Sequence, residues 1–384
     1  MKFYVAILLL FTLLKTGFAD LDAFYIWQQI DSPLLQKSIT NESPTTCFYS
    51  LASVVPAHGK SKIHTLKLDQ HNSVPVIRIP LSAFKRSDLL SELNRLTQTL
   101  HPSHEIQFDL DCPERLLERY LDLVTAYRQV HPNLRLSITA LPAHLKHKTF
   151  RKLAEVVDEY ILQVHGIDVP KKWNDPAELL NIKRAKKALR QAEGIGRPYR
   201  VALPCYAYEL NFNPTTENFL FLTAEKPSRR TDTLKKRIIA NPRDLIELQQ
   251  LIKTLPNCHG IIWFRLPIKG DRLCLPRASL TQIQKSEVPT DTVQCLIKPI
   301  NDHTLELELH NKNTIHACRA TLKINWSHPR GAFDLYQNVQ ASNSIPGQLP
   351  TTLSVPMPPP GDVLKIGWFH ATTNPPPQIE ITLQ

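Results

Sequence analysis

The chain has 384 residues, 42% of them hydrophobic, which excludes a disordered chain and suffices for one large domain and a smaller one. The formal charge of +11 is concentrated in residues 183–190, 228–230 and 235–237. One interpretation of these clusters is that they are solvated helix faces. The alternative is that they attract a partner, either a glycan or the anionic surface of the cell envelope. Nucleic acid is not expected as a partner, because stacking aromatics do not accompany the clusters.

The first residues have the pattern of a secretory signal. Lys2 precedes an apolar run over residues 3–14, and Gly17-Phe18-Ala19 forms a small-x-small end. The run is short for a bilayer span of about 20 residues, so an uncleaved anchor is the alternative. We therefore expect residues 1–19 to be removed, which leaves Asp20 as the first residue. We expect the protein to be exported to the periplasm or the medium and to have no transmembrane domain after cleavage.

Short apolar runs then recur with amphipathic segments between most of them, which predicts parallel βαβ units. In the segment 114–130, the side chains at Leu117, Tyr120, Val124 and Tyr127 follow the helical period and should face a sheet. Eight such units predict an α/β fold of the (β/α)8 barrel type over residues 20–287. A doubly wound open sheet is the alternative, although no Gly-rich dinucleotide turn follows an early strand. The predicted strands are 24–29, 48–55, 75–81, 105–111, 135–142, 159–165, 199–206 and 260–267.

The pattern changes after residue 287. Short strands alternate with Pro, Asn and Gly, which predicts a small all-β sandwich over residues 288–384. The longest insertion of the barrel, residues 207–243, follows the seventh strand, at the end of a barrel where loops build sites.

The fourth predicted strand, "EIQFDLD", carries acids on one side and apolar residues on the other. Barrel strands send alternate side chains inward, so the acids should face a polar interior and pair there with arginines. Inward positions are predicted at Arg78, Glu105, Gln107, Asp109, Asp111, Arg135, Ser137, Thr139, Gln163, His165, Arg200, Tyr206, Trp263 and Arg265. Those nearest the carboxyl ends of the strands are candidates for chemistry, whereas Glu105, Arg135 and Arg200 are expected to be structural.

Both acids at the carboxyl end of this strand have structural alternatives. Asp111 and Glu114, with Pro113 between them, match a capping box at a helix start. Asp109 could instead be a buried partner of Arg78 on the neighbouring strand.

The remaining candidates are equally ambiguous. His165 is either a hydrogen-bonded core histidine or a proton carrier near neutral pH. Glu209 is either a solvated loop acid or a second catalytic carboxylate. The candidates for binding a substrate, which could also be packing residues of the barrel rim, are Trp27, Gln28, Thr139, Gln163, Tyr206, Tyr208, Trp263 and Arg265.

Seven cysteines follow the apolar run, an odd count that leaves at least one unpaired. In an exported protein Cys295 with Cys318 is a plausible disulfide, and Cys258 with Cys274 a weaker one. No cysteine spacing is typical of a zinc site, and the sequence predicts neither a metal nor a cofactor.

The segments "YIWQQ", "EIQFDLDCPERLLERY", "LSITALPAHL", "YILQVHG", "VALPCYAY" and "GIIWFRLP" resemble the bacterial family of domains of unknown function numbered 3142. The resemblance implies a barrel related to those of glycosidases and brings no established activity. Chitinase-like enzymes carry D-x-x-D-x-D-x-E on the fourth strand. Asp109 and Asp111 match the two central acids of that motif, but Ile106 replaces its first acid and Pro113 its glutamate. In another group of glycosidases the carboxylates follow strands four and seven, which here would be Asp111 or Glu114, and Glu209.

Three functional hypotheses remain. The first is an exported glycan-active enzyme of the glycoside hydrolase type, with Asp109 or Asp111 as acid or base and Glu209 as a second carboxylate. The second is a non-catalytic glycan-binding or envelope scaffold protein. The third is a metal-dependent hydrolase that uses Asp109, Asp111 and His165.

Overall fold

The computed structural model describes residues 23–384 except residues 29–30, 67, 69–71, 103, 291, 337, 343–344 and 372–374. The predicted signal, residues 1–19, lies outside the described residues. The chain divides into two compact units. The first contains the described residues up to Gly166, together with Leu180–Pro204 and Arg243–Leu266. The second contains Ile167–Leu179, Cys205–Pro242 and Pro267–Gln384.

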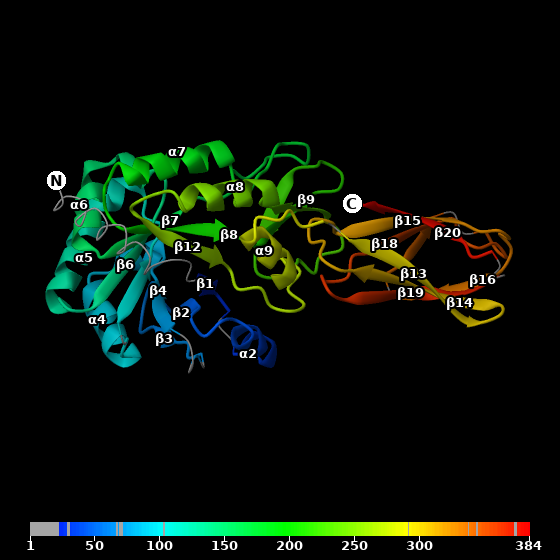
Figure 1. Ribbon diagram of the computed structural model, residues 1–384, viewed down its shortest axis with the longest axis horizontal. Coiled ribbons are helices and arrows are strands. Elements are labelled where there is room, and N and C mark those ends of the chain that lie inside the picture. Colours follow the sequence, from blue (N-terminus) through cyan, green and yellow to red (C-terminus); the bar gives the residue numbers. More distant parts are fainter. Residues whose placement is uncertain are drawn as a thin grey trace, which may run out of the picture. The chain divides into compact units, whose positions relative to one another are not determined.

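A closed barrel of parallel strands forms the first unit (Figure 1). Its first strand pairs in parallel with both its second and its last strand, so the sheet has no free edge. The strands are β1 (Ala23–Ile26), β2 (Cys47–Val54), β4 (Asn72–Arg78), β5 (Glu105–Asp109), β6 (Arg135–Ala140), β7 (Glu159–Gln163), β8 (Tyr199–Pro204) and β12 (Cys258–Phe264). A short strand β3 (Lys62–Ile63) runs antiparallel to β2. The predicted (β/α)8 barrel is confirmed, and every predicted barrel strand has a counterpart in it.

Helices connect the strands and cover the outside of the barrel (Figure 1). They are α2 (Pro33–Thr40), α3 (Leu81–Phe84), α4 (Leu89–Leu100), α5 (Leu117–Val130), α6 (Lys148–Val156), α7 (Ile182–Glu193) and α8 (Pro242–Ile252), with 3-10 turns η2 (Glu114–Leu116) and η3 (His144–Lys146). Helix α5 buries the four side chains predicted from its period, and Tyr127 packs against Phe108 of β5 with 4.7 Å between ring centroids. Among the described residues no helix has the length and apolar character needed to cross a bilayer.

The barrel interior has an apolar middle layer between two polar ends. Side chains from six strands form the middle layer, whose buried members are Ala23, Tyr25, Tyr49, Val74, Val76, Ile161, Ala202 and Ile262. Polar side chains of β5 and β6 run past this layer on the same side of the sheet, among them Gln107, Ser137 and Thr139, all nearly inaccessible to solvent. The polar interior predicted from the alternation of β5 is therefore present.

One predicted inward residue faces the other way. Ile262 and Phe264 of β12 pack into the interior layer, and neighbouring residues of a strand point to opposite sides. Trp263, which is 1% exposed, is therefore buried on the helix side of the sheet and does not line the interior, contrary to the prediction.

The second unit contains a small sheet built by the insertion after β8. Strands β9 (Ala207–Phe212), β10 (Phe219–Thr223) and β11 (Leu234–Ile239) pair antiparallel in the order β10-β9-β11. Helix α9 (Arg277–Gln284) belongs to the same unit.

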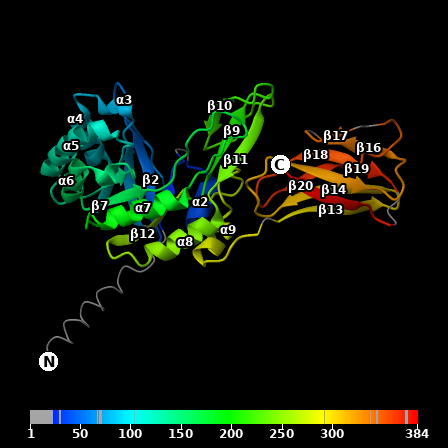
Figure 2. The same ribbon diagram turned by 90° about the horizontal axis from the view of Figure 1, so that it is seen from above.

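The C-terminal part of the second unit is a sandwich of two four-stranded antiparallel sheets (Figure 2). The first sheet contains β13 (Val293–Asn301), β14 (Thr304–Asn311), β19 (Val363–His370) and β16 (Ala332–Leu335); the second contains β17 (Gln340–Ser342), β18 (Thr352–Pro356), β15 (Arg319–Asn325) and β20 (Gln378–Leu383). Inward leucines, isoleucines and Phe369 form its core. The predicted sandwich is confirmed.

None of the seven cysteines forms a disulfide bond, so both suggested pairings are wrong. Cys295 belongs to β13 in one sheet of the sandwich, whereas Cys318 precedes β15 in the other. Burial raises the pKa of Cys295 and Cys258 to about 12, which keeps both thiols protonated and unreactive at neutral pH.

Candidate functional site

The carboxyl ends of β4 and β5 bring together one arginine and two acids. Arg78 ends β4 and donates through Nη1 to Oδ2 of Asp109, the last residue of β5. Its other terminal nitrogen, Nη2, donates to Oδ2 of Asp111 at 3.0 Å. The parallel register places Arg78 directly opposite Asp109. The structure thus confirms the predicted ion pair and adds Asp111 to it.

The two acids differ sharply in exposure. Asp109 is 2% exposed, whereas the side chain of Asp111 is 47% exposed. Burial raises the pKa of Asp109, and the charge of Arg78 opposes this effect. Thr139 of β6 also donates its hydroxyl to Oδ1 of Asp109 at 2.8 Å. Asp109 is therefore a sealed and fully bonded carboxyl, and Asp111 is the acid of the pair that solvent or a ligand can reach.

A buried histidine fixes the loop that carries Asp111. His144 accepts the N–H of Leu141 at Nδ1 over 3.1 Å, so Nε2 carries the proton and donates to the carbonyl of Cys112 at 2.7 Å. Burial lowers the pKa of His144, which favours this neutral form. The turn after β6 thereby holds the backbone next to Asp111.

The capping-box alternative for Asp111 and Glu114 is wrong. Pro113 occupies the cap position of the first helical turn, and no side chain caps that turn. Glu114 instead contacts Nε2 of His147, while Asp111 bonds to Arg78. Because both side chains bond to these other residues, neither of them caps the helix despite the matching sequence spacing.

Trp27, which follows β1, lies beside the same arginine. The guanidinium of Arg78 is 5.7 Å from the centroid of the Trp27 ring, a cation–π distance. The Trp27 ring also packs against Phe264 at 5.2 Å and Tyr25 at 5.9 Å, which leaves it half-buried. Gln28 accepts the N–H of Trp27 through its side-chain oxygen at 3.1 Å, so this predicted binding residue bonds locally. An aromatic surface therefore adjoins the acid pair.

Two further candidates come from β7 and the residues after it. Gln163, the last residue of β7, is half-buried and belongs to the inward set that contains Ile161. His165 lies with its ring 5.8 Å from that of Phe264, and burial lowers its pKa to about 4. A histidine with this pKa is neutral at pH 7, so His165 does not act as a cation there.

Gln107 connects the carboxyl end to the middle of the barrel. Its amide nitrogen donates to the hydroxyl of Tyr25 at 2.7 Å and contacts Oγ1 of Thr139 at 3.4 Å. Its amide oxygen accepts no hydrogen bond from any residue that the structure describes. The chain Tyr25–Gln107–Thr139–Asp109 thus ties the sealed acid to the packed interior.

The opposite end of the barrel holds a separate polar network that fits the predicted structural role. Glu105 accepts from Ser137 at 2.6 Å and pairs with Arg135 at 3.6 Å. Nearby, Glu159 pairs with Arg200 at 3.1 Å.

Glu159 has a second partner in His259, at 2.8 Å. Burial disfavours the charge on Glu159, but its bonds to His259 and Arg200 outweigh burial and lower its pKa. The sequence reasoning missed Glu159 and His259, although Glu159 shares the alternation of Gln163 and could have been found by it.

The other predicted site residues have local partners. Glu209 of β9, 1% exposed, accepts the N–H of Ser228 at 2.8 Å and pairs with Arg237 at 3.3 Å, all within the second unit. Tyr206 and Tyr208 belong to that unit too and pack edge to face at 5.1 Å. Arg265, just after β12, is 4% exposed.

The acids around Arg78 do not form a metal centre. Within residues 23–384, as far as they are described, no group of three or more His, Cys, Asp or Glu side chains is placed to hold a metal ion. A guanidinium already occupies the space between Asp109 and Asp111, and its positive charge would repel a second cation.

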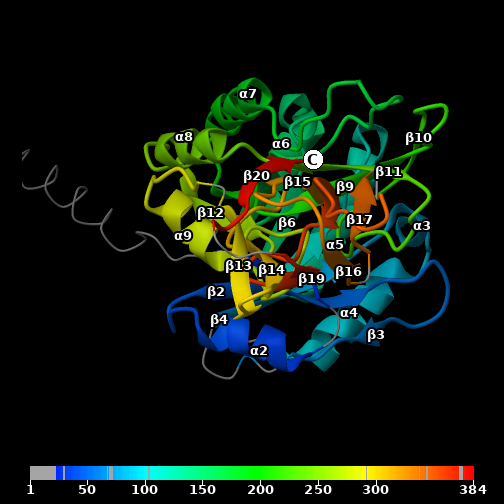
Figure 3. The same ribbon diagram turned by 90° about the vertical axis from the view of Figure 1, so that its right-hand side faces the viewer.

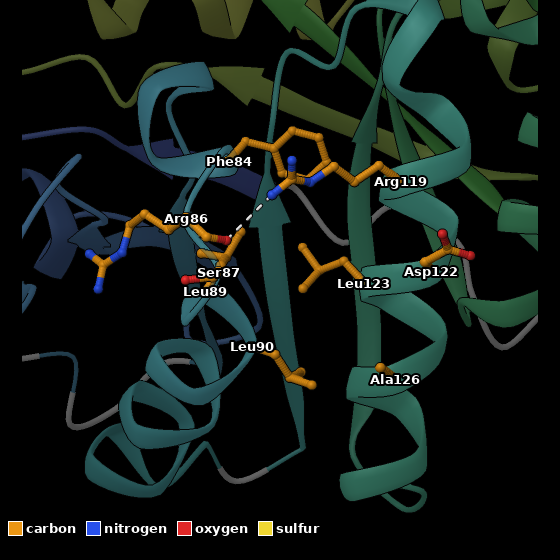
Figure 4. Close-up of a pocket in the computed structure, with 9 residues that line it drawn as sticks. All are labelled: Phe84, Arg86, Ser87, Leu89, Leu90, Arg119, Asp122, Leu123 and Ala126. Carbon is orange, nitrogen blue, oxygen red and sulfur yellow. Dashed lines mark hydrogen bonds between the residues drawn. The ribbon is translucent and has the colours of Figure 1, made fainter.

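A pocket of about 250 Å³ lies on the outside of the barrel between α4 and α5 (Figure 4). The ring of Phe84 and the guanidinium of Arg119, 5.2 Å apart, form one end. The remaining lining residues are Arg86, Ser87, Leu89, Leu90, Asp122, Leu123 and Ala126. Arg119 also donates to the carbonyl of Arg86 at 3.4 Å. Asp122 is the single acid among the lining residues, so this pocket lacks the paired carboxylates of the β5 end.

No curated protein sequence matches this chain. Among solved structures, it is similar to the spore cortex-lytic enzyme SleL of Bacillus cereus, with 12% identity, 64% of this chain and 71% of that chain covered, and a TM-score of 0.49. It is also similar to the chitinase ChiA74 of Bacillus thuringiensis, with 8% identity, 94% and 99% coverage and a TM-score of 0.44. The chitinase ChiB of Flavobacterium johnsoniae matches with 9% identity, 64% and 87% coverage and a TM-score of 0.43. The sequence profile of the domain of unknown function (DUF3142) family matches residues 60–269, more than half of the chain, and the chain belongs to that family.

Proposed function

We propose that this chain acts on a glycan at the carboxyl end of its barrel strands, with Asp111 as the catalytic carboxylate. The observation that supports this proposal most directly is the difference in exposure between the two acids that bond to Arg78. Asp109 is sealed and bonded on both oxygens, whereas Asp111 has 47% of its side chain exposed on the same guanidinium. Active sites of (β/α)8 barrels lie at this end of the strands.

The chemistry available to Asp111 is proton transfer at a glycosidic oxygen. A positioned carboxyl that donates or removes a proton accelerates a reaction by about 10²- to 10⁴-fold. Arg78 and Asp109 act as positioning residues, because their bonds fix the orientation of the Asp111 carboxylate. Trp27 offers an aromatic face on which a sugar ring can stack. Gln163, the last residue of β7, is a candidate for hydrogen bonds to the hydroxyl groups of the sugar.

Glycosidases of most families use two carboxyls, about 5 Å apart for retention or about 6.5–9.5 Å apart for inversion. Asp109 is the second carboxyl on Arg78, and burial raises its pKa, the direction expected of a proton donor. Its exposure of 2% favours the positioning role. Glu209 is assigned a structural role, because Arg237 and Ser228 already bond its carboxylate.

The test is release of reducing ends from a panel of cell-wall and storage glycans. Asp111→Asn should lower kcat by at least about 100-fold on the substrate that the panel identifies. Asp122→Asn, which changes another exposed acid, on α5, is the matched control and should leave the rate unchanged. Full activity of Asp111→Asn would contradict the proposal.

A non-catalytic glycan-binding or envelope scaffold protein is the second candidate. Its support is that one guanidinium neutralises both acids and that Pro113 stands where the chitinase-like motif has its glutamate. It predicts saturable binding of an oligosaccharide without turnover, with an affinity that Asp111→Asn leaves within about threefold. Turnover by the unaltered chain would exclude it.

We also propose that the chain is exported, to the periplasm or the medium, with residues 1–19 as its cleaved signal. The support is the basic start, apolar run and small-x-small end of that segment. The mature protein would then comprise a barrel domain to residue 287 and a sandwich domain from residue 288. Cell fractionation with N-terminal sequencing tests this, and a mature chain that retains Met1 in the cytoplasm would contradict it.

A further inference from the structure

One basic cluster of the described chain has acidic partners for only some of its cations. Of the three clusters in the sequence, residues 228–230 and 235–237 find acids within their own unit: Arg230 pairs with Asp232 at 2.6 Å and Arg237 with Glu209 at 3.3 Å. The third cluster, residues 183–190, is helix α7. Its Lys186 contacts Glu247 of α8.

Three cations of α7 remain without an ion pair or side-chain hydrogen bond to any residue of the described chain: Lys183, Lys187 and Arg190. Their spacing of four and three residues places them on one face of the helix. The opposite face buries Ala185, Ala188, Leu189 and Ala192 against the barrel. The row spans about 10 Å, at 1.5 Å per residue. All three side chains are exposed.

Helix α6 carries further exposed cations near the end of α7. Arg151 of α6 donates to the carbonyl of Gly194, just after α7, at 3.3 Å, which brings α6 beside the C-terminal end of α7. Both helices can be followed in Figure 3. Lys148 and Lys152 are exposed on α6 one turn apart, and neither has an ion-pair partner among the described residues. The exposed acid of this helix is Glu155.

Helix stability does not explain the arrangement. Cations are unfavourable near a helix N-terminus, where the helix dipole is positive, yet Lys183 lies in the first turn of α7 and no acid accompanies it there. Consecutive members of the row, Lys183 with Lys187 and Lys187 with Arg190, are about 5–6 Å apart along the helix axis. This is less than the Debye length of about 8 Å at physiological ionic strength, so neighbouring cations repel one another. Both unfavourable effects would be relieved by an anionic surface.

We propose that the exposed face of α6 and α7 docks on a bilayer rich in anionic phospholipids. Its exposed side chains, unlike those around Trp27, include no aromatic ring, so the face cannot stack sugars or bases and recognises charge alone. The apolar side of α7 is buried in the barrel, so docking is electrostatic and involves no insertion. This inference is independent of the proposed glycan chemistry, which uses other residues.

The test is co-sedimentation of the full chain with vesicles of phosphatidylcholine alone or with about a third phosphatidylglycerol. The unaltered chain should sediment with the anionic vesicles and not with the neutral ones, and 0.5 M NaCl should release it. The variant Lys183→Glu, Lys187→Glu, Arg190→Glu should lose at least about 100-fold in partition coefficient, since each basic residue near an anionic bilayer contributes roughly fivefold.

The control variant is Lys85→Glu, Lys312→Glu, Lys323→Glu, which changes three exposed lysines elsewhere by the same charge. It should bind within about fivefold of the unaltered chain. Equal loss in both variants would show that net charge alone drives binding and would overturn the proposal. So would absence of binding to anionic vesicles, including the case in which the chain binds soluble polyphosphate instead. Thermal unfolding of both variants confirms that they fold.

Discussion

Replacing Arg78 by methionine should destabilise the barrel strongly, because Asp109 would lose the cation that compensates its buried charge. Removing one partner of a buried ion pair costs about 3–5 kcal/mol. The Arg78 side chain is 35% exposed, so solvent screens part of the interaction, and we expect about 2–4 kcal/mol. For a folding unit of this size, that corresponds to a fall in Tm of roughly 5–12 °C.

The destabilisation should also depend on pH. Burial already raises the pKa of Asp109, and loss of Arg78 raises it further. A carboxyl whose pKa is higher in the folded state contributes stability below its unfolded pKa of about 3.9, and that contribution is lost as the pH rises through the folded pKa. The loss in free energy of unfolding caused by Arg78→Met should therefore be smaller at pH 4 than at pH 7.

Urea unfolding of the unaltered chain, Arg78→Met and Arg78→Met with Asp109→Asn, each at both pH values, measures these quantities. The double variant has no buried charge to compensate and should recover at least half of the loss at pH 7. A loss in free energy of unfolding below about 1 kcal/mol, or a loss of equal size at both pH values, would show that Arg78 does not compensate a buried charge on Asp109.

Two further substitutions test neighbouring groups. Thr139→Val removes the hydroxyl that donates to Asp109 and should reduce the free energy of unfolding by about 1–3 kcal/mol, measured in urea; an unchanged value would mean that the bond is dispensable. The pKa of His165 is lowered to about 4, so the unfolded chain takes up a proton that the folded chain does not, and stability falls as the pH drops from about 6.5 to 4. His165→Gln should remove about 2–3 kcal/mol of that loss between pH 7 and pH 4.5, and an unchanged slope would refute the burial of a neutral histidine.

The barrel and the acid pair could be predicted because β5 alternates strictly. Ile106 and Phe108 face the helices, which fixes the opposite direction for Gln107 and Asp109. The parallel order of strands then made Arg78 the neighbour of Asp109. Helix α5 could also be predicted from the sequence, because its four buried side chains follow one helical stripe.

Strand β12 could not be read in the same way. Its residues Ile261, Ile262, Trp263 and Phe264 are apolar on both sides, so alternation carries no information about direction. The prediction placed Trp263 and Arg265 inward together, but Arg265 lies beyond the end of β12. A register shift between Cys258 and Ile261 disturbs the phase further.

The partners of Asp111 and Glu209 depend on tertiary structure. A capping box requires only local spacing, and the sequence offers that spacing at Asp111 and Glu114. Asp111 instead bonds to Arg78, 33 residues earlier in the chain, because β4 and β5 are adjacent. The pairing of Glu209 with Arg237 likewise follows from the register of β9 and β11, which the sequence does not state.

The proposed glycan chemistry requires a sugar to be held between Trp27 and Asp111. A crystal structure of the chain with the oligosaccharide that the glycan panel identifies tests this directly. The account predicts a sugar ring stacked on Trp27, with a glycosidic oxygen within hydrogen-bond distance of Asp111. A saccharide bound solely to residues of the second unit, with the carboxyl end of β5 empty, would contradict it.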